Sequence, residues 1–159
     1  MSDDSLIKHL IELLDGGHAH ASFDAAIKGI PAEKCGVRPP GCPHSPWELL
    51  EHIRIAQNDI LRFSRERDYV SPAWPEGYWP AAPAPKNEAL WRKSVKSFRD
   101  DLAAFKELLW ERSGKLDEPF AWGQGQTLLR ETLLIADHNA YHVGQLVLVR
   151  RLLGNWPAA

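Results

Sequence analysis

The chain has 159 residues, of which 44% are hydrophobic and 25% are charged, and its formal net charge at pH 7 is -2. This length fits one domain with a substantial core, and the composition is that of an ordinary globular protein. The slightly acidic balance argues against a surface built to hold nucleic acid or acidic lipid.

The first residues, Met1-Ser2-Asp3-Asp4, are acidic, whereas the start of a secretory signal is basic. Lys8, His9, Glu12 and Asp15 then interrupt the aliphatic residues, so no apolar signal core follows. No stretch approaches the roughly 20 apolar residues that crossing a bilayer requires. The sequence therefore predicts a cytoplasmic protein, with residues 1–159 forming a single domain.

The first predicted helix runs from about Asp4 to Lys28, because aliphatic residues recur there at steps of three and four. Gly29-Ile30-Pro31 gives a stop signal. Gly16 and Gly17 weaken the middle of this helix by about 1 kcal/mol each relative to alanine.

The second predicted helix has the clearest start in the chain. Ser45 is suited to cap it, Pro46 to occupy the first helical position, and Glu48 to close a capping box. The helix fades near Arg67. Its inward stripe reads Leu49, His52, Ile53, Ala56, Ile60 and Phe63.

The third predicted helix covers about residues 87–113 and stops at Gly114. The fourth covers about 127–153 and ends at Gly154, with Pro157 beyond it. The last turns of the fourth helix are apolar on more than one side, which is typical of a helix central to a fold or covered by another subunit. No strand-like alternation competes, so we predict an all-α four-helix bundle.

The joint between the second and third helices, from about Asp68 to Lys86, is long and contains Trp74, Tyr78 and Trp79 among several prolines. A connection of this length allows the two helices to run parallel or antiparallel. Long loops tend to be functional or disordered, and the large aromatics argue against disorder. These side chains either roof a binding pocket or merely cover one end of the core.

Two cysteines, Cys35 and Cys42, lie in a Pro/Gly-rich segment and form no disulfide framework. We interpret them as free loop thiols. A zinc site that adds His44 is an alternative whose spacing fits no standard zinc motif, and a disulfide is another.

His138 and His142 are four residues apart, so they share one face of the fourth helix and can converge on one metal ion. Ile135 and Val149 share that face, which directs the pair into the bundle. His52 lies in the apolar stripe of the second helix. Each histidine alone is more often a hydrogen-bonded core residue, but three inward histidines on two helices favour a metal site.

Two motifs resemble the DinB-like (DinB/YfiT) superfamily of metal-binding four-helix bundles. They are His-Ser-Pro-Trp-Glu-Leu-Leu-Glu-His at 44–52 and Ala-Asp-His-Asn-Ala-Tyr-His-Val-Gly-Gln-Leu at 136–146. The resemblance implies parallel second and third helices joined by a long crossover, and often a homodimer. It also implies a divalent ion, usually nickel or zinc. The sequence itself does not separate these from iron, which is a further candidate. The residues matching the family's ligands are His52, His138 and His142.

Three protein ligands leave one coordination position for water or substrate, which is the arrangement of catalytic sites. An ion there lowers the pKa of a water or thiol and so creates a nucleophile. The resemblance allows a transferase of low-molecular-weight thiols or a hydrolase acting on a small molecule. It equally allows a non-catalytic metal-binding or stress-response module. A bundle whose histidines are only structural is the third interpretation.

Side chains near the three histidines are candidates to assist them. Glu48 lies one turn before His52 and either serves as a general base or only closes the capping box. Tyr141 and Gln145 are each three residues from a histidine of the pair and can edge the site. We predict Glu48 and Tyr141 as catalytic residues. Glu131 and His20 are further candidates for approaching the site. A solvated or salt-bridged Glu131 is an equal alternative, and a surface or structural role is favoured for His20.

Overall fold

The computed structural model describes residues 3–157, and within that range it contains five α-helices and no strand. The helices are α1 (Asp3–Asp15), α2 (Phe23–Ile27), α3 (Pro46–Arg65), α4 (Glu88–Glu111) and α5 (Leu128–Leu152). Two short 3-10 helices, at Ala32–Lys34 and Glu76–Tyr78, lie in the connections. The predicted all-α class is confirmed. Among the described residues, none of the helices combines the length and apolar character needed to cross a membrane.

The prediction of one continuous helix over residues 4–28 is wrong, because the chain breaks it into α1 and α2. Gly16 and Gly17 both adopt positive φ angles, of 64° and 86°, which end a right-handed helix and favour glycine. A new start follows at Ser22, whose hydroxyl accepts a hydrogen bond from the amide of Ala25. The two glycines therefore form a corner between two helices.

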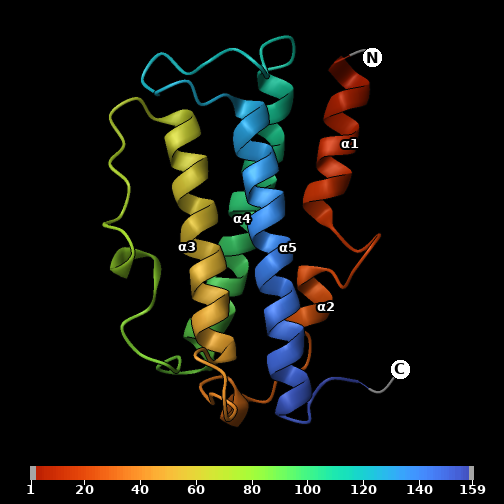
Figure 1. Ribbon diagram of the computed structural model, residues 1–159, viewed down its shortest axis with the longest axis vertical. Helices are drawn as coiled ribbons and strands as arrows, with labels where there is room; N and C mark the ends of the chain where they lie inside the picture. The colour runs from red at the N-terminus through yellow and green to blue at the C-terminus, as the bar shows by residue number, and fades with distance from the viewer. Residues whose placement is uncertain (1–2, 158–159) are drawn as a thin grey trace.

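The longer helices lie side by side along the long axis of the molecule, and α1 and α2 follow one another beside α5 (Figure 1). The helix α3 packs against α4 and α5, while α1 and α2 pack against α5. Residues 66–87 return along the length of the bundle, so α3 and α4 run in the same direction and α5 runs opposite to them (Figure 1). The crossover therefore passes along the outside of α3.

Two separate apolar clusters fill the bundle. One joins α1 to the end of α3, the end of α4 and the start of α5, and the other joins α2 to the opposite ends of those helices. A polar bridge also lies inside the bundle: Gln57, 1% exposed, donates to the carbonyl of Phe98 at 2.7 Å and accepts from Asn139 at 3.0 Å. Asn139 directly follows one of the predicted metal ligands in sequence.

The predicted capping box at the start of α3 is confirmed. The hydroxyl of Ser45 accepts from the amide of Glu48, and the amide of Ser45 donates to the Glu48 carboxylate. The same hydroxyl donates to the carbonyl of Pro83 at 2.5 Å. The cap therefore also fixes the end of the crossover to the first turn of α3.

The helix α5 is central, as its apolar pattern predicts, yet it also presents large apolar side chains to solvent. They are Leu133, Tyr141, Leu148 and Leu152. The homodimer implied by the resemblance stays a prediction.

Arg150 joins α2 to the end of α5 and is almost completely buried. Its guanidinium donates to the carbonyls of Ala25, Ala26 and Asn155, at distances of 2.7 to 3.2 Å. Ala26 is buried, so the arginine satisfies a carbonyl there that would otherwise be left unpaired, and it also joins the less buried carbonyls of Ala25 and Asn155.

We expect Arg150→Met to lower the free energy of unfolding by about 2 kcal/mol, because it leaves the buried carbonyl of Ala26 without this donor. The neighbouring Arg151 is exposed. The matched control Arg151→Met should therefore change stability by less than about 0.5 kcal/mol. Urea unfolding of both variants measures the difference. Equal effects would show that Arg150 does not fasten α2 to α5.

Candidate metal centre

The structure brings together the three histidines that the sequence predicts as metal ligands. One ring nitrogen of each of His52, His138 and His142 lies within 4.8 Å of the other two. The Nε2 atoms of His52 and His138 are 3.1 Å apart. Nitrogens bound to one tetrahedral ion at about 2.0–2.1 Å stand about 3.3 Å apart, so this spacing fits a single divalent ion.

Two neighbouring antiparallel helices position these rings. His52 comes from α3, and His138 and His142 come from successive turns of α5. His52 and His142 are 4% and 8% exposed, whereas His138 is only partly buried. The rings of His52 and His142 are therefore shielded from solvent, and that of His138 is less shielded.

Hydrogen bonds on the far side of two rings select the form that binds metal. The Nδ1 of His52 lies 2.9 Å from the carbonyl oxygen of Tyr78. A carbonyl can only accept, so Nδ1 carries the proton and Nε2 of the neutral ring keeps its lone pair. The Nδ1 of His142 bonds in the same way to Oε1 of Gln145 at 2.7 Å. The expectation that Gln145 edges the site is confirmed.

The three rings are neutral at pH 7. Burial lowers the pKa of His52 below its ordinary value, despite the opposing effect of the bond to Tyr78. Burial, reinforced by the neighbouring histidines, lowers the pKa values of His138 and His142 to about 4. Metal ligation needs neutral imidazole, so protons compete weakly at this site near neutral pH.

An aromatic side chain from the crossover covers one ring of the triad. The indole of Trp79 stacks on His52, with ring centroids 4.0 Å apart and an angle of 4° between the planes. His44 stacks on the same indole at 4.0 Å. Trp74, in contrast, is 75% exposed. Of the two interpretations of the crossover aromatics, Trp79 therefore fits the roof and Trp74 does not.

Sequence reasoning did not identify the contacts made by the crossover. The carbonyl of Tyr78 belongs to the backbone, which no side-chain pattern reports. His44 precedes the cap of α3, and only its distance of eight residues from His52, about two helical turns, hints that both can meet one aromatic ring.

The structure also places the two residues that we predict as catalytic. The carboxylate of Glu48 accepts from the amide of Ser45 and from both Nε and Nη2 of Arg38. Burial raises the pKa of Glu48, but these hydrogen bonds outweigh it, so the pKa is lowered and the group is ionised. Tyr141 is 63% exposed, and its ring centroid lies 4.9 Å from that of His142. A proton-transfer role for either residue stays a prediction.

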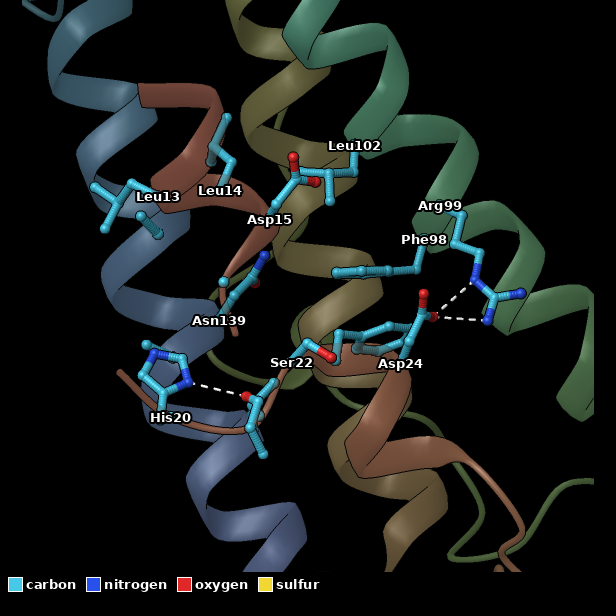
Figure 2. Close-up of a pocket in the computed structure, with 16 residues that line it drawn as sticks. Leu13, Leu14, Asp15, His20, Ser22, Asp24, Phe98, Arg99, Leu102 and Asn139 are labelled. Carbon is cyan, nitrogen blue, oxygen red and sulfur yellow. Dashed lines mark hydrogen bonds and ion pairs between the residues drawn. The ribbon is translucent and has the colours of Figure 1, made fainter. Parts of the chain in front are cut away.

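The other candidates lie away from the three histidines. Glu131 is buried and pairs with Arg130. His20 bonds to the carbonyl of Ala21 at the edge of a separate cavity of about 120 Å³ between α1, α2, α4 and α5. Figure 2 shows this cavity, with Asp24 and Arg99 paired at its rim. Neither Glu131 nor His20 belongs to the metal-binding group.

The two cysteines are free, as predicted. Cys35 is buried, and burial raises the pKa of its thiol to about 11, which makes it a poor nucleophile. Among residues 3–157, the group of three histidines is the one arrangement found that could hold a metal, so the alternative zinc site with His44 does not form.

A family model described as the DinB superfamily matches residues 17–146 of the chain. This range includes all three histidines of the group and both motifs that carry the resemblance. No curated protein and no solved structure is significantly similar to the chain.

The metal-free protein should lose stability as the pH falls from about 6.5 towards 4. In this window the unfolded chain protonates His138 and His142, while the folded chain, with pKa values of about 4, does not. The loss of stability is absent at pH values above the pKa of these histidines in the unfolded chain. It is complete at pH values below their pKa in the folded chain. Urea unfolding in chelator at several pH values measures it. The double variant His138→Gln and His142→Gln should show a flatter pH profile, and an unchanged slope would contradict the assignment.

Proposed function

The chain belongs to the DinB superfamily, and from that premise we propose that it holds one divalent metal ion at His52, His138 and His142. We propose nickel or zinc as the ion, with iron as a further candidate. The reaction that we propose is transfer of a low-molecular-weight thiol to a small electrophile, or hydrolysis of a small molecule. When bound, the ion would lower the pKa of a thiol or water and so supply a nucleophile near neutral pH.

The donor set carries this proposal. Three neutral imidazoles with converging nitrogens suit nickel, zinc and iron better than calcium or magnesium, which prefer oxygen ligands. The bonds from His52 to Tyr78 and from His142 to Gln145 orient the rings before any ion arrives. Three protein ligands leave a coordination position for substrate, unlike a closed structural zinc site.

We assign proton transfer at this site first to Tyr141. Its exposed ring lies against His142 at the solvent side of the group, where a substrate can reach it. Glu48 would act as a base only after Arg38, whose side chain is half exposed, released its carboxylate. In the arrangement described, Glu48 instead stabilises the start of α3 and so supports His52 one turn later.

The test is to titrate nickel and zinc into untagged, metal-free protein and then assay conjugation of a thiol to an electrophile. We expect one ion per chain, and His52→Ala should weaken binding at least about 100-fold, because one of three ligands is lost. His9→Ala, which removes an exposed histidine of α1, is the matched control. If the wild-type chain binds no ion, the proposed site is refuted. Tight binding without conjugation or hydrolysis would leave a metal-binding module.

Tyr141→Phe should lower the rate of the assayed reaction by about 100-fold, the usual contribution of a positioned acid or base. The metal affinity of this variant should be unchanged, because the phenol is not a ligand. Isothermal titration and initial rates measure the two quantities separately. A parallel loss of affinity would mean that Tyr141 acts by supporting His142 rather than by proton transfer.

A further inference from the structure

We propose that Tyr78 and Asp59 form a latch that positions His52 and thereby sets the affinity of the metal centre. The latch joins the crossover to the same helix that carries His52. This inference rests on the proposed metal site and names the residues that tune it, at a distance from the ligands themselves.

Tyr78 reaches two points on α3 at once. Its backbone carbonyl accepts from Nδ1 of His52 at 2.9 Å, and its phenol donates to Oδ2 of Asp59 at 2.7 Å. Asp59 is seven residues after His52, so the two lie on the same face of α3, about 10 Å apart along the helix axis. One residue of the crossover is therefore fixed at both its side chain and its backbone, and the backbone end touches the metal ligand.

The Asp59 end of this latch is a strong anchor. Oδ2 of Asp59 accepts from the phenol of Tyr78, while Oδ1 is buried without a hydrogen-bond partner, and the phenol of Tyr69 also lies near this carboxylate. Burial and the adjacent carboxylate both raise the pKa of Tyr78, which keeps the phenol protonated and donating. A hydrogen bond to a charged partner in such a place is among the stronger ones in proteins.

The next residue of the crossover holds the same histidine from another direction. Trp79 stacks flat on the ring of His52, while Tyr78 holds its edge at Nδ1. Together the two residues fix both the plane and the rotation of the imidazole, and so the direction of its Nε2 lone pair. Docking of the crossover on α3 then favours metal binding at His52. By reciprocity, bound metal should hold the crossover more tightly against α3.

The test compares the zinc affinity of the wild-type chain, Tyr78→Phe and Asp59→Ala, measured by competition with a chelating dye. Each variant should bind about 10-fold more weakly, because the backbone carbonyl that orients the metal-binding His52 is kept but is no longer held in place. The double variant should be no weaker than either single one, because both remove the same contact. Asp59→Asn keeps an acceptor oxygen and should recover most of the affinity.

Tyr69→Phe is the matched control. Burial and the nearby Asp59 raise the pKa of Tyr69 to about 12, so its phenol also stands near this carboxylate, but the crossover bond to His52 comes from Tyr78. The zinc affinity of the Tyr69→Phe variant should stay within about twofold of wild type. The visible spectrum of the cobalt-loaded protein provides a second readout, which should change in Tyr78→Phe and not in Tyr69→Phe.

The outcomes separate this inference from the proposed function. Failure of the wild-type chain to bind zinc or cobalt would refute the metal site itself. Tight binding by the wild type together with equal affinity and an equal cobalt spectrum in Tyr78→Phe would overturn the latch. If Asp59→Ala does not fold, Tyr78→Phe decides the question, since it keeps the buried volume nearly unchanged.

Discussion

Three neutral imidazoles packed against one another inside a helical bundle impose the main constraint on this structure. Each ring has two nitrogens that must find partners, because an unpaired polar group buried in a protein costs about 1–3 kcal/mol. The outward nitrogens of His52 and His142 meet the carbonyl of Tyr78 and the amide of Gln145. The ring nitrogens that face the other histidines have only one another as neighbours, and their arrangement decides which ion the centre can bind.

The direction of the helices explains why the crossover takes part in the site. Parallel α3 and α4 need a connection as long as the bundle, and this connection runs along the outside of α3 (Figure 1). Ser45 fixes its far end through the carbonyl of Pro83, and Asp59 fixes it near the middle through Tyr78. A segment required by topology thus becomes the support and the cover of a metal ligand. A bundle with a short turn at this point would have no backbone carbonyl available for His52.

The sequence predicts the parts of the fold that depend on local chemistry. The capping box at Ser45 and Glu48 involves neighbouring residues, and the spacing of His138 and His142 places them on one helical face whatever the tertiary structure. The split between α1 and α2 is different. Two glycines cost only about 2 kcal/mol in a helix, so local propensity leaves the choice open. Tertiary contacts add to it, because Arg150 of α5 donates to the carbonyls of Ala25 and Ala26 and so holds α2 in its own position. The contacts of Tyr78 and Trp79 likewise depend on the path of the crossover.

The ring nitrogens that face one another carry too few protons to satisfy all their lone pairs, which favours a cation at the centre. The Nδ1 atoms of His52 and His142 carry protons, because their acceptors are oxygens, so the neutral rings keep bare Nε2 atoms. The contact of 3.1 Å between His52 and His138 is then attractive only when Nε2 of His138 carries the proton. Three ring nitrogens therefore share a single proton in the metal-free chain. A divalent ion would place a larger charge among all three lone pairs, and the neutral ring of His138 would then carry its proton on Nδ1 instead of Nε2. A purely structural trio would gain more from apolar side chains of similar volume, which fill the same space without unpaired nitrogens.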